Sequence, residues 1–258
     1  MMFIQRPDAR LHSLSFGQGP ITLLATGGWV GSGEVWHDLF GRLPHWRCIS
    51  VDHRGTGASS HTGPITVEAM ADDLIAVADA QRVGTCVLAA ESAGAAAALQ
   101  AVLRAPQLFA GLVLVGASWQ SPVPGANDAF IASLRQDYLA TLRGFVDACL
   151  PETDSVDLRR WGVQVLSRAS VDDAVELLSC RAALELETQV QGIHVPVLLI
   201  HGADDCIVAP QSSRDLAALL PHADLQVMPG LGHVPIVTEP ARVAALIDHF
   251  GTKAAGRQ

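Results

Sequence analysis

Short apolar runs that alternate with helical patterns constrain the fold of this chain more than any other feature of its sequence. Strands that alternate with helices are typical of βα units built around a mostly parallel sheet. Thr66 is placed to cap the first long helix, and the tail 251–258 is expected to fray. The sequence therefore predicts an α/β chain with a mostly parallel central sheet flanked by helices. Strands are expected at residues 9–17, 21–26, 46–51, 86–90, 112–115, 195–200 and 225–228, and helices at 65–80, 93–103 and 238–250.

Residues 119–191 interrupt this alternation because they contain no strand pattern. Helical patterns occupy 129–150, 158–168 and 171–187. We expect several helices inserted between two strands, which divides the chain into a core (1–118 and 192–258) and a cap (119–191). Open α/β sheets bind ligands at the carboxyl ends of their strands, so the insertion can serve as a lid over that edge. The alternative is a set of additional helices with no lid role.

The charge balance and the cysteines exclude several other classes of protein. The chain has 26 acidic and 17 basic residues, a formal net charge of −9 and no cluster of Lys or Arg, which disfavours a nucleic-acid partner. Its five cysteines are odd in number and contain no C-x-x-C pair, which disfavours a disulfide framework or a zinc site. We find no signal-peptide pattern and no apolar run near the ~18 residues of a membrane span. We expect a cytoplasmic protein with a small-molecule partner and no membrane partner, and leave a homodimer open.

The segment 86–94 runs from an apolar strand through a serine into a helix. Ser92 stands between Ala90 and Gly94, which are small residues two positions before and two positions after it. A nucleophile on a sharp strand-to-helix turn requires small residues there, because neighbouring backbone closes in on them. The turn also directs the backbone N–H of Ala93 at the site, where the positive end of the helix favours an oxyanion. The alternative for Ser92 is an ordinary helix N-cap.

Two further chemically competent residues follow later strands. The strand at 195–200 leads into Asp204 and Asp205, and Asp205 is favoured as the acid by its offset from Gly202, although both aspartates can be solvated loop residues. His233 lies on a glycine-rich loop after the next strand, where a mobile loop lets a general base reach the serine. The order serine, aspartate, histidine, each just after a strand, is that of α/β-hydrolases and not of the other serine hydrolase folds.

With these residues in place, the sequence resembles the α/β-hydrolase superfamily over about residues 20–250. Residues 52–59 (DHRGTGAS) resemble the family's D-x-R-G-x-G-x-S turn, and residues 27–36 (GGWVGSGEVW) resemble its oxyanion loop, which normally reads H-G-x followed by a tryptophan. Aligned through Trp36, the family's histidine is replaced by Gly27. The resemblance implies an α/β-hydrolase fold with a helical cap insertion. It also implies that the backbone N–H groups of Trp29 and Ala93 form the oxyanion hole, with Gly28 as donor if the register shifts by one residue.

The resemblance also implies a reaction. A serine nucleophile excludes the branches that open epoxides or remove halides, since those use an aspartate. His233 would take the proton of Ser92, which attacks an acyl carbon while Asp205 holds the imidazole, and water would release the acid without any metal or organic cofactor. We expect the substrate to be a carboxylic ester or lactone of a small, largely apolar molecule. The pocket is expected to include Gly28, Trp29 and Trp119, with Trp36 as either a pocket residue or a packing residue.

Two alternatives share the same three residues. One is a carbon–carbon bond hydrolase or an acyltransferase, which keeps the serine chemistry but changes the bond or the acceptor. The other is a small-molecule receptor with slow or vestigial hydrolysis, because the cap segment faintly resembles the four-helix lid of the receptor branch of this superfamily. Glu91, which directly precedes Ser92, receives no role from the sequence.

Overall fold

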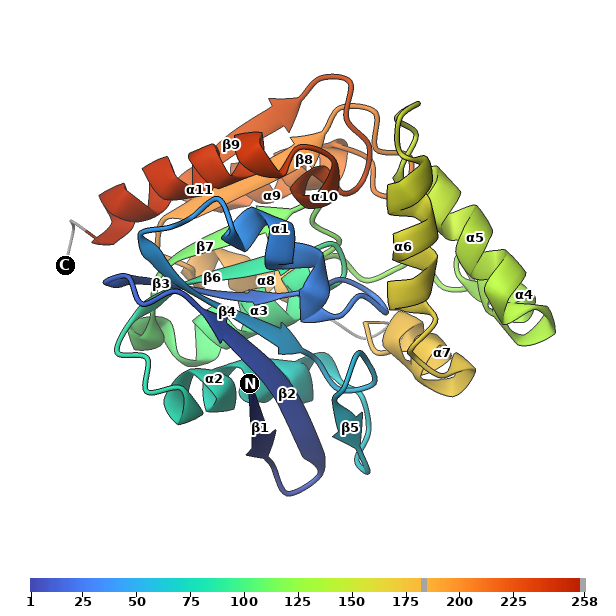
Figure 1. Cartoon of the computed structure of the whole chain (residues 1–258), viewed down its shortest axis with the longest axis horizontal. Helices are drawn as coiled ribbons and strands as arrows, with labels where there is room; N and C mark the ends of the chain where they lie inside the picture. The colour runs from blue at the N-terminus through green and yellow to red at the C-terminus, as the bar shows by residue number, and fades with distance from the viewer. Residues whose placement is uncertain (182–184, 256–258) are drawn as a thin grey trace.

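A central sheet of nine strands organises the computed structural model, which describes residues 1–181 and 185–255 (Figure 1). The strand order is β1-β2-β4-β3-β6-β7-β8-β9, with β5 paired to β2. Along this sheet order, the pairings β4–β3, β3–β6, β6–β7, β7–β8 and β8–β9 are all parallel. The strand β2 pairs antiparallel with β1, β4 and β5. The strands are β1 (Met2–Gln5), β2 (Ala9–Phe16), β3 (Ile21–Thr26), β4 (Trp46–Asp52), β5 (Ser60–His61), β6 (Cys86–Glu91), β7 (Phe109–Val115), β8 (Val197–Gly202) and β9 (Ala223–Met228). The predicted α/β class and mostly parallel sheet are confirmed.

The parallel strands are buried on both faces, which explains why they read as continuous apolar runs in the sequence. Leu24 and Leu199 point to one hydrophobic core, and their neighbours Leu23 and Leu198 point to the other. Helices cover both faces (Figure 1). The first core lies under α2 (Val67–Ala80), α3 (Gly94–Arg104), α8 (Leu186–Gln189) and α9 (Gln211–Leu219), and the second under α1 (His37–Phe40), α10 (Pro235–Thr238) and α11 (Pro240–Ala255).

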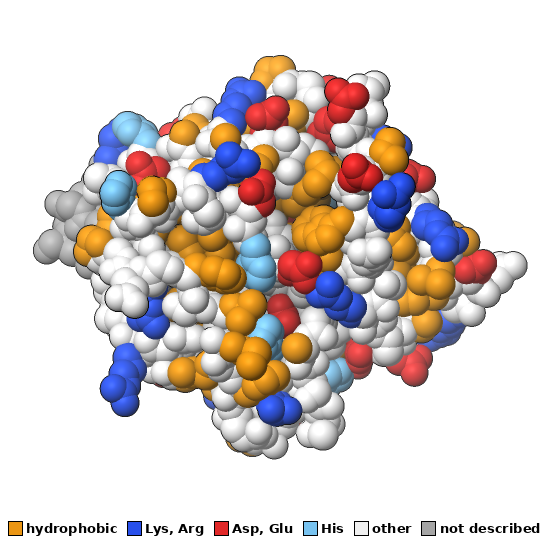
Figure 2. Space-filling model, in the orientation of Figure 1, with side chains coloured by type: hydrophobic (Ala, Val, Ile, Leu, Met, Phe, Trp, Pro, Cys, Tyr) orange, Lys and Arg blue, Asp and Glu red, His pale blue; other side chains and the backbone are white. Residues whose placement is uncertain are grey.

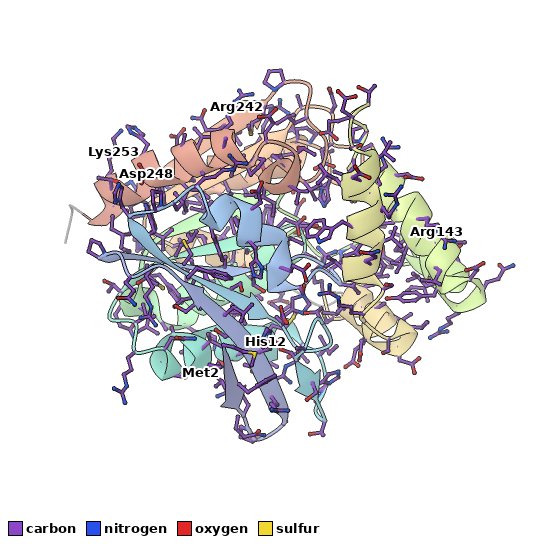
Figure 3. The ribbon with its side chains drawn as sticks, in the orientation of Figure 1. Met2, His12, Arg143, Arg242, Asp248 and Lys253 are labelled. Carbon is purple, nitrogen blue, oxygen red and sulfur yellow. The ribbon has the colours of Figure 1, made fainter. Side chains whose placement is uncertain are left out.

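The end of the chain differs from the prediction of a frayed tail after residue 250. The helix α11 continues to Ala255, and residues 256–258 lie outside the described part. Gly251 packs so closely on Trp46 that an added Cβ would lie 2.0 Å from the indole ring. The indole N–H of Trp46 also donates to Asp248 Oδ1 at 2.7 Å, and Asp248 is labelled on α11 in Figure 3. Contact with the second core therefore holds this last stretch of helix in place.

Among the described helices between β7 and β8, four lie together on one side of the sheet, whereas the short α8 packs on the first core (Figure 1). The predicted pattern at 129–150 is divided at Asp137, whose Oδ1 accepts the backbone N–H of Ala140 at 2.9 Å and caps the second of the helices. The boundaries 119–191 of this insertion stay a prediction, and residues 182–184 within them lie outside the described part. The four helices are α4 (Asp128–Gln136), α5 (Tyr138–Cys149), α6 (Val156–Leu166) and α7 (Val171–Ser179).

Side-chain hydrogen bonds tie the inserted helices to the core. The indole N–H of Trp29 donates to the carbonyl of Ala174 on α7 at 2.8 Å. The Oδ1 of Asp173, also on α7, lies 2.9 Å from His61 Nε2. The backbone N–H of Ile65 donates to Glu176 Oε1 at 2.6 Å. These contacts hold α7 against the loop that follows β3 and against the segment from β5 to the start of α2.

Candidate active site

Ser92 occupies a strained turn between β6 and α3. Its φ is +49°, a left-handed conformation that is costly for any residue except glycine. The backbone N–H of Ser92 donates to the carbonyl of Val115 at 2.8 Å, which holds the turn against β7. A Cβ on Gly94 would lie 2.4 Å from the carbonyl oxygen of Gly27, so a small residue is required at this position. The strand, turn and helix predicted around Ser92 are therefore present, and the strain belongs to the serine itself.

The structure brings Ser92, His233 and Asp205 together in one hydrogen-bonded chain. The Oγ of Ser92 lies 2.9 Å from His233 Nε2, and the Nδ1–H of His233 donates to Asp205 Oδ2 at 2.7 Å. All three residues are buried. Asp204 points to solvent instead, so the structure places the predicted acid, and not its neighbour, beside the imidazole.

The Asp205 carboxylate is saturated with hydrogen bonds. Oδ1 accepts the backbone N–H groups of Ile207 and Val208 at 2.8 and 2.9 Å. Oδ2 accepts from His233 and lies 3.0 Å from Nε2 of a second histidine, His201, which the sequence analysis did not single out. Burial alone would raise the pKa of Asp205, but the hydrogen bonds from His201 and His233 outweigh it and hold the pKa well below the usual value. Asp205 is therefore ionised at neutral pH and fixed in orientation.

The loop that carries His233 contacts the inserted segment. The backbone N–H of His233 donates to the carbonyl of Cys149, the last residue of α5, at 3.0 Å. The N–H of Gly232 donates to Glu152 Oε1 at 2.8 Å, and a Cβ on Gly232 would lie 2.3 Å from Pro151. The inserted segment therefore supplies both a backbone partner and a side-chain partner to this loop, and the predicted mobility of the loop stays a prediction.

Glu91, which receives no role from the sequence, lies in the site beside His233. Its side chain is buried, and its Oε1 lies 3.6 Å from His233 Nε2. Burial raises the pKa of Glu91 to about 7, although the nearby His233 ring and a hydrogen bond from the Gly28 backbone act in the opposite direction. Burial lowers the pKa of His233, but the bond to Asp205 and the charge of Glu91 outweigh it and raise that pKa. A second carboxyl group therefore lies near the His233 ring, beside the nitrogen that contacts Ser92.

The oxyanion loop is supported from the turn that follows β4. The Nε2 of His53 lies 2.8 Å from the carbonyl oxygen of Gly28, and burial keeps the pKa of His53 low, so its neutral ring donates this bond. His53 thereby supports the loop where the family's usual histidine is replaced by Gly27. A Cβ on Gly28 would lie 2.4 Å from Glu91 Oε2, so the backbone of Gly28 is packed against this carboxyl. Trp29 and Gly28 both stay candidates for the second donor beside Ala93.

Two cavities meet at Ser92. One is lined mainly by apolar residues, many of them on α5 and α6, and also by Glu91, Ser92 and His233. The other is wider and more open, and is bordered by α4, α5 and the end of α7. Gly28 lines the first cavity and Trp29 lines both, as expected.

Trp119 and Trp36, the two other candidate pocket residues, do not line either of the cavities that meet at Ser92. Trp119 is buried with its indole N–H donating to the carbonyl of Ser212 at 3.1 Å, and it borders a separate cavity that does not include Ser92. Trp36 is buried in the second core and donates to the carbonyl of Thr26 at 2.9 Å. Assigning Trp119 to the substrate pocket is therefore a mistake, because its position after β7 turns the ring toward α9. Trp36 is a packing residue.

No group of three or more His, Cys, Asp or Glu side chains within residues 1–181 and 185–255 is arranged to hold a metal ion. None of the described helices is both long enough and apolar enough to cross a bilayer. On the face shown in Figure 2, acidic and basic side chains are interspersed rather than gathered into a patch of one sign.

Comparison with known proteins decides the family. The model of the alpha/beta hydrolase fold family matches residues 21–240. The chain belongs to the alpha/beta hydrolase fold family. The predicted fold is thus confirmed, and this member of the family is a hydrolase.

Three similar proteins illustrate the range within this hydrolase family. A relative from Caulobacter sp., named as a candidate carbamate hydrolase, is 29% identical over 89% of this chain and 90% of its own length. A pimeloyl-[acyl-carrier protein] methyl ester esterase from Yersinia enterocolitica is 28% identical over 91% of this chain and 94% of its own. The solved structure of an esterase from Exiguobacterium antarcticum superposes with a TM-score of 0.91 at 21% identity, covering 97% of this chain and 98% of that one.

Proposed function

We propose that the chain is a serine hydrolase that cleaves a carboxylic ester or a lactone of a small molecule through an acyl-enzyme on Ser92. The observation that carries this proposal is the chain of hydrogen bonds from Asp205 through His233 to Ser92 at the meeting point of two cavities. The fold alone does not fix a reaction, so the proposal depends on this geometry. The esterases among the similar proteins agree with it.

In the proposed mechanism, His233 accepts the Ser92 proton as Oγ attacks the acyl carbon. Asp205 holds the Nδ1–H tautomer and stabilises the imidazolium that forms. The oxyanion develops between the backbone N–H groups of Trp29 and Ala93, in a site that is already organised before the substrate binds. His233 then donates its proton to the leaving alcohol, and the same base activates the water that releases the acid.

The strained turn favours this role for Ser92 over a simple helix cap. An N-cap serine normally has extended dihedral angles and bonds the N–H groups of the first helical turn. Ser92 instead has a positive φ and directs its Oγ to His233 Nε2. Backbone strain of this kind is concentrated at functional sites, where the surrounding structure holds it.

A panel of p-nitrophenyl esters and small lactones tests the proposal. The unmodified protein is expected to turn over at least one short-chain ester many times, and Ser92→Ala is expected to lose about 10⁴-fold to 10⁶-fold of kcat while it unfolds at a similar temperature. Mass analysis after treatment with a fluorophosphonate is expected to show a single adduct on Ser92. An adduct on Ser118, or activity that survives in Ser92→Ala, would overturn the proposal.

The same panel separates the alternatives. Carbon–carbon bond hydrolysis would require turnover of a diketone-type acid in preference to all esters, and acyl transfer would require product formation that depends on an added alcohol or thiol. A receptor with vestigial activity would release a single equivalent of product and then stop.

A further inference from the structure

Arg181 stands at the end of α7 with half of its guanidinium group unused. Its Nη1 donates to the carbonyl oxygen and the Oγ of Ser118, at 3.0 and 2.5 Å. Its Nε is buried and has no hydrogen-bond partner within residues 1–181 and 185–255. The edge formed by Nε and the second Nη is the one that binds a carboxylate with two parallel hydrogen bonds. That edge therefore has no partner among the described residues.

No carboxylate of the described residues balances the charge of Arg181. Burial lowers its pKa, and the adjacent Cys180 thiol gives no compensation at neutral pH because burial raises the pKa of that thiol to about 11. Asp73 and Asp215 border smaller cavities that Arg181 also reaches, but Asp73 is bound by Arg54 and Arg6, and Asp215 accepts from Gln211. A buried guanidinium without a counter-ion is costly, because it loses water and gains no opposite charge.

The buried arginine of the core shows the contrast. Arg54 is fully buried, whereas Arg181 is half-buried, and Arg54 donates to both oxygens of Asp73 at 2.8 and 3.0 Å and to Asp8 at 3.0 Å. Its guanidinium is fully used within the fold. Arg181 has the same demand for an anion and meets it only with the hydroxyl and carbonyl of Ser118.

Arg181 also faces the nucleophile through the wide cavity. It is the only charged side chain among the described residues that line this cavity, which includes Ser92 and Ala93. Ser118, which holds Arg181, donates its backbone N–H to the carbonyl of Ser92 at 3.1 Å. One residue therefore fixes the guanidinium and the nucleophile relative to each other.

We propose that Arg181 binds a carboxylate carried by the substrate, so that the molecule hydrolysed at Ser92 is an anionic ester with its carboxylate in the wide cavity. This inference rests on the proposed ester hydrolysis and narrows its substrate class to esters that bear one free carboxylate. The apolar cavity takes the uncharged part of the molecule, and the cavity of Arg181 takes the charged part. The expected substrate is thus apolar at one end only.

The charge of the site favours a carboxylate over a phosphate. One guanidinium supplies one positive charge and one free edge with two N–H directions, which matches the two oxygens of a carboxylate. A phosphate monoester carries about −1.5 to −2 charges at pH 7, which this single cation would leave unbalanced. No second Lys or Arg among the described residues lines the wide cavity.

Matched pairs of charged and uncharged esters test this inference. Monomethyl glutarate and methyl valerate differ by a carboxylate on the acyl side of the ester. 4-Acetoxybutyrate and butyl acetate differ by a carboxylate on the alcohol side. We expect the anionic member of at least one pair to have the higher kcat/KM. Arg181→Gln is expected to raise KM for that ester about tenfold to hundredfold, the usual range for a lost charge-assisted hydrogen bond, and to leave the uncharged ester nearly unchanged. Arg181→Lys is expected to restore part of the loss, because it returns the charge without the two-pronged geometry.

Arg143→Gln is the matched control, because it removes an exposed arginine from α5 that projects from the outer side of the inserted helices (Figure 3). It is expected to leave both esters unchanged. A readout without turnover is calorimetric binding of glutarate to Ser92→Ala, which Arg181→Gln should abolish. Equal losses for charged and uncharged esters in Arg181→Gln, or glutarate binding that persists without Arg181, would overturn the inference while the hydrolase proposal stands. If the unmodified protein hydrolyses none of the esters, the hydrolase proposal is overturned. Glutarate binding would then still decide whether Arg181 binds a carboxylate.

Discussion

The Nδ1 of His233 lies 2.7 Å from Oδ2 of Asp205, a carboxylate that already accepts two backbone N–H groups. Asp205→Asn removes the charge that orients the imidazole, and the amide can stabilise the wrong tautomer. We expect a loss of about 10⁴-fold in kcat, as in other enzymes with this triad. Asp204→Asn is the control, since its exposed side chain lies next to Asp205 in sequence and should change kcat little. Steady-state kinetics on the best ester of the panel measures kcat of both variants. An equal loss in Asp205→Asn and Asp204→Asn would show that Asp205 has no special role.

Glu91→Gln should shift the pH dependence of the reaction. Activity falls on the acid side as His233 becomes protonated, and the negative charge of Glu91 raises the pKa of His233. Removing that charge lowers the pKa of His233, so the acid limb of kcat/KM should move to lower pH. Because the two groups lie 3.6 Å apart, the limb of the unmodified protein belongs to the pair and not to one residue. Glu187→Gln, at an exposed position, is the control, and a profile of Glu91→Gln that coincides with it would contradict the coupling.

The Glu91 carboxyl group is also expected to make the free energy of unfolding depend on pH. Burial raises the pKa of Glu91 from 4.5 to about 7, so its neutral form is the one that the fold favours. Its contribution is fully present below pH 4.5 and is lost as the pH rises through about 7. The free energy of unfolding of the unmodified protein should therefore decline over this interval relative to that of Glu91→Gln. Urea titrations at several pH values measure the difference, and parallel curves would show that Glu91 stays charged in the fold.

His53→Leu should impair the reaction without touching the triad. His53 donates to the carbonyl of Gly28 and supports the loop that presents the Trp29 amide. Loss of a whole oxyanion donor costs about 10²-fold to 10³-fold in kcat, so loosening its support should cost about tenfold to hundredfold. KM should change less than kcat, since the bond acts on the transition state. His45→Leu, at an exposed histidine, is expected to have no effect. An unchanged kcat in His53→Leu would show that the loop holds its shape without this bond.

The inserted helices should keep their protection when product binds. Their hydrogen bonds to Trp29, His61 and Ile65 hold α7 on the core, which suits a gate that opens little. Hydrogen exchange across 119–181 is therefore expected to change little when a product acid is added, alongside multiple turnovers that His233→Ala abolishes. Ligand-dependent loss of protection across α4 to α7, together with a single turnover, would favour the receptor alternative.

The sequence was most informative where a short local pattern carries the structure. The turn at Ser92 could be predicted because its small flanking residues are neighbours in the chain, and Asp205 and His233 because each directly follows an apolar strand. All seven expected strands are present, whereas β1 and β5 were missed because they are short edge strands.

Residues whose role depends on distant partners could not be predicted. His201 and His53 look like two of ten histidines, and only the fold shows that one touches Asp205 and the other Gly28. Arg181 becomes significant only through burial without a counter-ion, which no local pattern records. The pocket assignment of Trp119 failed for the same reason, since the direction of a ring after a strand is set by packing against α9.

The contacts that hold the His233 loop limit which parts of this chain can be exchanged for those of a related chain. The carbonyl of Cys149 and the carboxylate of Glu152 belong to the inserted segment, yet they fix the loop of the base. A chimera that exchanges the whole of 119–191 would therefore import new substrate walls and remove part of the catalytic scaffold in one step. A functional chimera should keep residues 149–152 together with the β-sheet of the same parent. Only the parts of the insertion before and after these four residues should be exchanged. The insertion is therefore not a separate module throughout, because four residues in its middle, 149–152, belong structurally to the loop that carries His233.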